Sequence, residues 1–433
     1  MAIAVYNIFL LLYRIGAALI SPWNQKAKRW IEGRKDIFEK IRSSGIAAQP
    51  SVIWMHCASL GEFEQGKPLL ERIRKDYPTH KIVLTFFSPS GFDAKKDYKG
   101  ADYIFYLPFD SKRNARTFID IVKPKLVLWV KYEYWFYYLD ELKKQQIPIL
   151  LVSGIFREDQ IFFKSYGRLH RSMLECFQYF FVQTENAKKL LGTIGFTNNV
   201  SVSGDTRFDR VIEIAEQFSS NEIIEKFCAD SKVIVAGSTW EEDEEELDHY
   251  ANTHKELKFI IAPHEIDEER LKEVEALFRS CIRFSLLEKM IADGRWPMAE
   301  FRSDNSYQPT TNVLIIDNIG MLSKLYKYAF ITYVGGGFGD DGVHNVLEAA
   351  VYGKPVVFGP VIEKYIEAVE LVDHGGGFVI DSALEAEETF NRLLKNEEEY
   401  NEACNAAKDY VHSRKGATEN IMQFIQENRL LTS

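Results

Sequence analysis

Glycines at the end of a predicted strand form the first candidate site of this chain, within residues 330–359. Ile331 to Val334 are β-branched or aromatic residues typical of a buried strand, and Gly335 to Gly337 follow directly. Glycines let backbone N–H groups approach a ligand closely. The pattern then predicts a helix over 345–352, whose N-terminus favours phosphate or carboxylate. Glycines after a strand are also common in doubly wound sheets, so the anion site is one of two interpretations.

Glu62 is the candidate general base. It follows a predicted apolar strand over 52–56 and stands beside Gly61 in a tight turn predicted over 59–62. A carboxyl group at the end of such a strand is partly removed from water, which raises its pKa towards the range useful for accepting a proton. The same position suits an acid that stabilises the N-terminus of the helix predicted over 64–76, and the local sequence favours that structural role.

Polar turns follow several other predicted strands. They are Ser88 to Gly91, Lys131 to Glu133, Gly237 to Thr239, and Pro263 to Glu265. The carboxyl ends of parallel strands share one edge of a sheet, and ligands of such sheets bind there. A lone histidine near a strand end is usually a polar contact, but His264 shares its predicted edge with Ser238 and Gly335. A binding role and a plain polar contact therefore stay equally open for His264.

The elements that position these residues alternate between strand and helix. Strands are predicted over 52–56, 81–86, 102–106, 126–130, 148–152 and 180–183, and in a second series over 232–236, 259–262, 312–316, 331–334 and 356–358. This alternation predicts parallel, doubly wound sheets. The expected fold class is α/β: two Rossmann-like domains facing a cleft, the architecture called GT-B, plus an N-terminal membrane-anchor helix. The predicted boundaries are 1–45 for the anchor and its basic segment, 46–209 for the first domain and 210–433 for the second.

Composition describes a folded protein. The 433 residues are 46% hydrophobic and 27% charged, enough for two or three ordinary domains with real cores. A formal net charge of -10 argues against nucleic acid as a partner. The 5 cysteines are scattered, odd in number and lack a C-x-x-C pair, which fits a reducing compartment and predicts no metal site.

The N-terminal stretch Ala2 to Ile20 is apolar apart from Asn7 and Arg14. About 20 apolar residues form a spanning helix, and no small-residue cleavage site suggests a signal peptide. Between Lys26 and Arg42, seven basic residues outnumber three acidic ones, a local charge of +4. Such residues lie on the cytoplasmic side of an apolar helix and attract anionic lipid. We therefore predict a membrane anchor, spanning or interfacial; the alternative is a buried first helix.

Five motifs occur in an order and spacing that resemble one known family. They are W-M-H-C-A-S-L-G-E (Trp54 to Glu62), Q-T-E-N-A (Gln183 to Ala187), G-D-T-R-F-D (Gly204 to Asp209), A-G-S-T (Ala236 to Thr239) and G-V-H-N-V-L-E-A-A (Gly342 to Ala350). Each motif alone is weak. Together they extend over nearly the whole chain, which resembles the 3-deoxy-D-manno-octulosonic acid (Kdo) transferases of lipopolysaccharide biosynthesis.

The resemblance implies an inverting GT-B glycosyltransferase that moves Kdo from CMP-Kdo to the lipid A precursor (lipid IVA) without metal or other cofactor. It implies Glu62 as general base, and Arg207 at the position of a family lysine that supports the transition state. The positions that fall where the family binds CMP are Pro263, His264, Gly320, Met321, Leu322, Asn345, Val346, Leu347 and Glu348. Ser238, Thr239, Gly336 and Gly337 are expected to add backbone dipoles for CMP-Kdo.

The acceptor is expected at Ser88, Ser90, Glu133 and Arg157, in the first domain. The resemblance also implies the inner membrane, at its cytoplasmic face, as the place of action. Lys131 replaces the first of two acids in the family motif. The role of that acid therefore passes either to Glu133 or to Lys131, which would pair with an anion. His264 replaces an arginine, and Met321 replaces a glutamate, which leaves a backbone contact there.

Two other functions stay open. One is another GT-B transferase that uses a UDP-sugar and a lipid acceptor. The other is a catalytically inactive GT-B scaffold that binds lipid at the membrane, which the change at Lys131 keeps open. A comparison of stabilisation by cytidine and uridine nucleotides distinguishes the Kdo transferase from the UDP-sugar transferase. The effect of replacing Glu62 on transfer tests whether the chain is catalytic at all.

Overall fold

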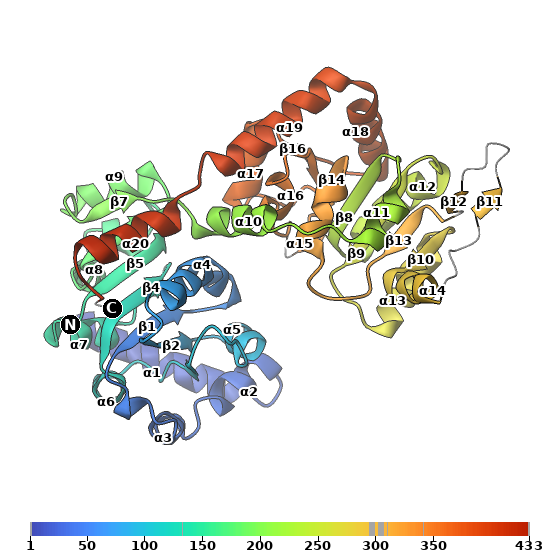
Figure 1. Ribbon diagram of the computed structural model, residues 1–433. Helices are drawn as coiled ribbons and strands as arrows, with labels where there is room; N and C mark the ends of the chain where they lie inside the picture. The colour runs from blue at the N-terminus through green and yellow to red at the C-terminus, as the bar shows by residue number, and fades with distance from the viewer. Residues whose placement is uncertain are drawn as a thin grey trace. The chain divides into compact units, whose positions relative to one another are not determined.

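The computed structural model describes residues 2–131, 133–293, 299–301, 307–309, 311–340 and 342–431. The chain forms two compact units (Figure 1): unit 1 is Met1–Asp209 with Gly416–Ser433, and unit 2 is Arg210–Lys415. Each unit holds a parallel sheet of seven strands with helices packed on it. The predicted α/β class with two doubly wound sheets is confirmed.

The sheet of unit 1 has the strand order β3-β2-β1-β4-β5-β6-β7. Its strands are β1 (Val52–Cys57), β2 (Lys81–Phe86), β3 (Tyr103–Tyr106), β4 (Pro124–Val130), β5 (Ile149–Gly154), β6 (Tyr179–Val182) and β7 (Val200–Val202). The chain proceeds from β1 to β2 on one side and later to β4 on the other, so the order reverses at β1. Open α/β sheets bind ligands at such a switch point, beyond the carboxyl ends of the strands.

Alternating side chains of these strands supply two cores, one on each face of the sheet. Trp54 and Trp129 are buried in one core, and Met55 and Leu128 are buried in the other. The helices of unit 1 are α1 (Ala2–Ile20), α2 (Gln25–Glu32), α3 (Ile37–Ser43), α4 (Leu60–Asp76), α5 (Pro89–Lys95), α6 (Lys112–Val122), α7 (Phe136–Lys144), α8 (Arg168–Leu174), α9 (Glu185–Thr193) and α20 (Ala417–Glu427), with 3-10 turns η1 (Ile46–Ala48) and η2 (Ile161–Phe163).

Helix α1 rests on unit 1 by one face only. Tyr6 and Leu10 are buried, and the Tyr6 hydroxyl donates to Oδ2 of Asp110 over 2.6 Å. The Tyr137 hydroxyl donates to Oδ1 of Asn7 over 2.7 Å. Ten large apolar residues stay exposed: Ile3, Val5, Ile8, Phe9, Leu11, Leu12, Tyr13, Ile15, Leu19 and Ile20. The alternative of a buried first helix is wrong, because only 11% of this apolar stretch is buried, and its length and hydropathy suffice to cross a membrane.

The C-terminal helix α20 belongs to unit 1, although the sequence analysis assigns residues 210–433 to the second domain. Its Ile421, Met422 and Ile425 are buried in the core that also contains Met55. Figure 1 shows α20, in red, among the blue and green elements of unit 1. The spacing of apolar residues predicted the helix but not the domain against which it packs, because the apolar faces of both domains could bury it equally well.

Unit 2 repeats the plan with the strand order β10-β13-β9-β8-β14-β15-β16. These strands are β8 (Val233–Thr239), β9 (Lys258–Pro263), β10 (Cys281–Arg283), β13 (Val313–Ile315), β14 (Ile331–Val334), β15 (Val356–Phe358) and β16 (Gly377–Val379), while β11 (Ala299–Phe301) and β12 (Tyr307–Pro309) form a separate antiparallel pair. The order reverses at β8, which lies between β9 and β14. The carboxyl end of β8 is therefore the switch point of this sheet.

The helices of unit 2 cover both faces of its sheet (Figure 1). They are α11 (Glu222–Cys228), α12 (Glu241–Thr253), α13 (Glu268–Leu277), α14 (Phe284–Ala292), α15 (Leu322–Leu325), α16 (Leu347–Ala350), α17 (Ile366–Asp373), α18 (Ala383–Lys395) and α19 (Glu397–His412), with the 3-10 turn η3 (Tyr326–Tyr328). Helix α10 (Thr206–Glu216) contains the boundary between the units.

Three local predictions differ from the structure at positions that matter for function. Helix α4 begins at Leu60, so Glu62 lies inside its first turn and not in a preceding turn. Strand β8 continues through Thr239, because a bulge between Gly237 and Thr239 keeps the strand paired with β9. The helix predicted over 345–352 is a single turn, α16, that begins at Leu347.

Candidate active site

Glu62 is buried at the switch point of unit 1, with 5% of its surface exposed. Its carboxylate accepts a hydrogen bond from the backbone N–H of Ala58, which lies between β1 and α4. Burial raises the pKa of Glu62 to about 8, because removal from water penalises the charged form more than the Ala58 hydrogen bond favours it. The predicted desolvation is confirmed, and the same carboxyl also caps the first turn of α4. A carboxyl with this pKa can accept a proton near neutral pH.

Two charged groups from the end of β4 act on the Glu62 carboxyl. Glu133 raises its pKa by repulsion and Lys131 lowers it by attraction. Lys131 has φ 67, a left-handed conformation that is uncommon for a residue with a side chain. Ser153 at the end of β5 has φ 52. Such conformations cost energy and cluster where the fold needs a particular side-chain direction, so the carboxyl edge of this sheet has the character of a functional site.

His56, buried at the end of β1, faces the same place and was not singled out from the sequence. Its Nδ1 lies 2.9 Å from the Thr85 hydroxyl, which also accepts a hydrogen bond from Trp54. Its Nε2 has no hydrogen-bond partner and lies 3.9 Å from Oε2 of Glu133. Burial lowers the pKa of His56, so the neutral ring is favoured. The Nε2 side of the ring therefore faces Glu133.

Arg207 is held by Asp205 at the start of α10. Its Nε and Nη2 donate to Oδ2 of Asp205 over 3.0 and 2.8 Å. Gln65 and Gln183 donate to the same carboxylate over 2.7 and 3.0 Å. Burial opposes ionisation of Asp205, but Arg207 and these hydrogen bonds outweigh it, so the pKa of Asp205 lies below its usual value. Asp205 therefore fixes the direction of the Arg207 guanidinium and connects it through Gln65 to the helix that carries Glu62.

The four residues predicted for the acceptor separate into two groups. Ser88 and Glu133 line one cavity of about 580 Å³ beside α1, and the hydroxyls of Ser88 and Ser90 lie 2.6 Å apart. Arg157 is exposed in the loop between β5 and η2, where its backbone N–H donates to Gln160. The structure brings Ser88, Ser90 and Glu133 to the edge that carries Glu62, and gives Arg157 no such contact.

In unit 2, Asp243 in the first turn of α12 organises the switch point. Its Oδ2 accepts hydrogen bonds from the backbone N–H groups of Gly336 and Trp240 over 2.8 and 2.9 Å. Its Oδ1 accepts from the Tyr333 hydroxyl over 2.7 Å. Burial raises the pKa of Asp243 against the effect of these three bonds. The protein thus places its own carboxylate on the Gly336 amide, in the glycine turn that the sequence analysis left open as a site for a bound phosphate or carboxylate.

The glycine turn is required by close packing of backbone. A β-carbon on Gly335 would lie 2.4 Å from the Ser238 carbonyl oxygen, and one on Gly337 would lie 2.5 Å from the Gly359 nitrogen. Gly336 has φ 89, which favours glycine. The turn does not enter a helix, because α16 begins ten residues later at Leu347. The predicted helix dipole behind the glycines is therefore wrong.

The other predicted donor residues lie near the same edge. Ser238 has φ 54 in the β8 bulge, and the Thr239 hydroxyl donates to Glu244 over 2.7 Å. A β-carbon on Gly237 would lie 2.3 Å from Cδ1 of Leu322, which brings the segment Gly320–Met321–Leu322 against β8. Nδ2 of Asn345 donates to Oε1 of Glu348 over 2.9 Å, while Val346 and Leu347 are buried. Pro263 is the last residue of β9, and His264 follows it in an exposed position.

Similarity to known proteins agrees with this fold. Residues 32–210 match the family model described as 3-Deoxy-D-manno-octulosonic-acid transferase (kdotransferase). A bifunctional glycosyltransferase/methyltransferase of Fusobacterium nucleatum subsp. nucleatum is 28% identical over 449 residues, which cover 99% of this chain and 62% of that protein. A 3-deoxy-D-manno-octulosonic acid transferase of Chlamydophila psittaci is 28% identical over 342 residues, 76% of this chain and 74% of that protein.

Among solved structures, the UDP-GlcNAc 2-epimerase from Neisseria meningitidis bound to UDP-GlcNAc is similar with a TM-score of 0.59 and 18% identity, over 87% of this chain and 100% of that one. This likeness concerns the fold alone. The pair of doubly wound units gives the chain a fold of the GT-B type, which this solved structure shares. The chain is thus similar to Kdo transferases, the family that the five motifs resemble.

Proposed function

We propose that this chain transfers Kdo from CMP-Kdo to the lipid A precursor, lipid IVA, with the acceptor bound by unit 1 and the donor by unit 2. The observation that carries the proposal is Glu62, a buried carboxyl at the switch point of unit 1 whose pKa is raised to about 8. A group of this kind suits removal of a proton from a sugar hydroxyl. Similarity to Kdo transferases supports Kdo as the transferred sugar.

The reaction is a single displacement. The acceptor hydroxyl oxygen forms a bond to the anomeric carbon of Kdo, the bond from that carbon to the phosphate oxygen breaks, and CMP leaves with the bonding electrons. The Glu62 carboxylate takes the hydroxyl proton. One displacement inverts the anomeric configuration, and no metal takes part. Arg207, oriented by Asp205, supplies positive charge to the donor phosphate and carboxylate, and Lys131 either assists it or pairs with an acceptor phosphate.

The donor contacts follow from the edge of unit 2. We assign Ser238, Thr239, Pro263, His264 and the segment Gly320–Leu322 to the nucleotide, and Asn345 with Glu348 to sugar hydroxyls, which an amide and a carboxylate can bind together. Val346 and Leu347 contribute through their backbone. Since Asp243 holds the Gly336 amide, Gly336 and Gly337 contribute close backbone approach and not a free anion site.

An apolar cavity in unit 1 supports a lipid acceptor. It measures about 820 Å³ and is lined by residues of α1 that include Val5 and Phe9, by Ile161 and Leu169, and by Glu133. Glu133 also lines the 580 Å³ cavity that contains Ser88. The Glu133 carboxylate thus borders two cavities that residues of α1 also line, and its charge raises the pKa of Glu62. We propose that an acyl chain of the acceptor occupies the apolar cavity while its sugar reaches Glu62.

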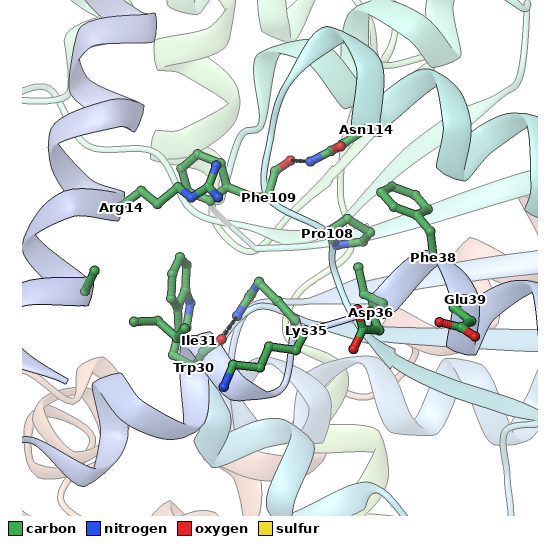
Figure 2. A pocket seen from close by; sticks show the side chains of 13 residues that line it. Arg14, Trp30, Ile31, Lys35, Asp36, Phe38, Glu39, Pro108, Phe109 and Asn114 are labelled. Carbon is green, nitrogen blue, oxygen red and sulfur yellow. Dashed lines mark hydrogen bonds between the residues drawn. The ribbon is translucent and has the colours of Figure 1, made fainter. Parts of the chain in front are cut away.

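A third cavity supports contact with the membrane surface. It measures about 630 Å³ between α1, α2 and α3 (Figure 2), where Arg14 extends from α1 and Lys35 lies at the opposite side. In its lining, the cations of Arg14, Arg34 and Lys35 outnumber the acids Asp36 and Glu39, and a net positive charge beside apolar walls suits a lipid phosphate. Trp23 and Tyr166 are 86% and 74% exposed, as aromatic residues at a membrane interface are. We propose that α1 lies in the interface of the inner membrane, because a spanning orientation would break the bonds of Tyr6 and Asn7.

The double variant Phe9→Glu with Leu12→Glu is expected to lose at least tenfold in affinity for vesicles that contain anionic phospholipid. Both side chains are more than half exposed, so the fold is retained while two apolar contacts with lipid, each worth about 1.5–3 kcal/mol, are lost. Co-sedimentation with vesicles measures this. Leu286→Glu, at a half-exposed apolar residue of α14, is the control and should bind like the wild type. Unchanged binding of the double variant would contradict an interfacial α1.

Transfer is expected to accelerate with pH up to the pKa of Glu62. The base must be a carboxylate, and a pKa of about 8 leaves it mostly protonated at lower pH. We expect kcat/KM to rise about tenfold per pH unit below 8 and to level above it. A profile already flat at pH 6 would exclude Glu62 as the base.

The same raised pKa links folding to pH. Protonated Glu62 stabilises the fold fully below its ordinary pKa of 4.5, and this contribution is lost as pH rises through 8. In Glu62→Gln, the free energy of unfolding in urea should not fall in this way as pH rises. This measurement tests the raised pKa of Glu62 independently of activity.

The donor distinguishes the rival functions. If the donor is CMP-Kdo, CMP should raise the melting temperature of the purified protein and UDP should not. Stabilisation by UDP alone would favour a UDP-sugar transferase. A lipid-binding scaffold without activity would release no CMP from CMP-Kdo in the presence of acceptor.

A further inference from the structure

Trp240, His264 and His344 bring three rings together at the switch point of unit 2. Nε1 of Trp240 donates to Nε2 of His344 over 2.9 Å, and the two rings are nearly coplanar, with an interplanar angle of 16° and centroids 6.4 Å apart. An in-plane hydrogen bond between coplanar rings makes one continuous flat surface. Because Nε2 of His344 accepts this bond, its ring carries its proton on Nδ1.

The backbone of the switch point holds this flat pair. Trp240 precedes α12, and its N–H donates to Asp243. The N–H of His344 donates to the Gly335 carbonyl over 3.0 Å. A β-carbon on Gly336 would lie 2.8 Å from Cδ2 of His344, so the glycine turn lies directly against that ring. Asp243 and the glycine turn therefore support the pair from one side.

The other face carries His264. Its ring stacks on Trp240 and on His344, with centroids 4.6 Å apart in both cases and interplanar angles of 25° and 14°. Equal distances to both rings put the imidazole over the seam between them. His264 follows the last residue of β9 and is exposed. The His264 imidazole thus covers the flat surface formed by Trp240 and His344. Because His264 is exposed, it is the ring of the three that can move outward.

We infer that the coplanar Trp240–His344 pair is a stacking platform for the nucleobase of the donor, which enters between the platform and His264. The base takes the position over the seam, and His264 shifts outward to cover its second face. The inference rests on the proposed function for the presence of a nucleotide in unit 2. It adds Trp240 and His344 to the residues proposed to bind the donor, since neither was predicted from the sequence. It also gives His264 a stacking role.

Ligand specificity follows from the platform. Stacking recognises the flat face of any base, whereas the phosphate and ribose contacts lie elsewhere on the edge. Ribose 5-phosphate, which lacks the base, should therefore bind without using Trp240. A purely structural ring cluster predicts the opposite: removal of Trp240 would destabilise unit 2 and weaken both ligands alike.

The test is calorimetric titration of the full chain with CMP, UMP and ribose 5-phosphate. Trp240→Ala should weaken CMP binding roughly 5- to 150-fold and leave ribose 5-phosphate unchanged. Trp240→Phe keeps an aromatic face and should lose less, and it also tests the platform if the alanine variant unfolds. His264→Ala should weaken CMP binding to a smaller extent, because one face of the base stays covered. His249→Ala, at an exposed histidine of α12, is the matched control and should change nothing.

The outcomes separate the platform from the donor assignment. If CMP binds the Trp240 variants and the wild type equally, the platform is overturned while the donor assignment stands. If UMP binds in preference to CMP with the same dependence on Trp240, the platform stands and CMP-Kdo as donor fails. If no nucleotide binds better than ribose 5-phosphate, the base has no site and both are overturned.

Discussion

Replacing Glu62 by glutamine is expected to lower the rate of Kdo transfer by roughly 10²–10⁴-fold. Glutamine has the same shape and keeps an oxygen that can accept the Ala58 hydrogen bond, so α4 retains its cap. It cannot take a proton from the acceptor hydroxyl. CMP binding, measured by calorimetry, should stay at the wild-type value, since we assign the nucleotide to unit 2.

Glu64→Gln is the matched control in the same helix. Glu64 forms a surface ion pair with Lys95 over 3.0 Å and is 41% exposed, so its replacement should change neither transfer nor stability measurably. If Glu62→Gln transferred Kdo at the wild-type rate, Glu62 would have only its capping role, and the base would have to be sought among Glu133 and His56.

The variant Asp205→Ala is expected to lose roughly 3–5 kcal/mol of unfolding free energy. Asp205 is buried and accepts hydrogen bonds from Arg207, Gln65 and Gln183, so its removal leaves a cation and two amides without their common acceptor. Urea unfolding of the full chain, followed at the first transition, measures the loss. We also expect slower transfer, because Arg207 loses its fixed direction.

Asp120→Ala provides the comparison. Asp120 pairs with Arg116 over 3.7 Å on the surface of α6, and its loss should cost less than about 1 kcal/mol. A loss for Asp205→Ala that is as small as this would show that Arg207 and the two glutamines find other partners, and Asp205 would not be the residue that positions Arg207.

The central strands were predictable because they are short, apolar and bounded by turns. β2, β14 and β15 have the predicted bounds, and the predicted alternation yields two sheets that each reverse at their first strand. This is enough to place Glu62, Ser238 and His264 at carboxyl edges of strands, where ligands bind. The motif that ends in Glu62 is therefore visible in the sequence as a candidate site at the carboxyl end of a strand, although the predicted helix begins two residues after Glu62 and not at Leu60.

The parts that were not predictable depend on contacts distant in the chain. Trp240 and His344 are 104 residues apart, and Asp243 lies 93 residues from the Gly336 amide that it occupies. Nothing in the local pattern pairs them. The left-handed Lys131 and Ser238 also have ordinary sequence surroundings, because tertiary packing imposes their conformation. The glycines indicated close backbone approach correctly, but the approaching groups are Ser238 and Gly359.

Lys131 is a residue whose electrostatic effect the structure shows and the sequence does not. The resemblance implies an acid at this position, and here the Glu133 charge raises the pKa of Glu62 while the Lys131 cation lowers it. A second acid at this position would repel the Glu62 carboxylate further. With Lys131 and Glu133 of opposite charge, the pKa of Glu62 is raised less than it would be beside two acids, which suits the general base that we propose.

The most direct test of Kdo transfer is the mass of the lipid product after incubation of the purified protein with CMP-Kdo and lipid IVA. We predict a product heavier by one or more Kdo units, with one CMP released for each, in the wild type and not in Glu62→Gln. An unchanged lipid mass with intact CMP-Kdo would contradict the account.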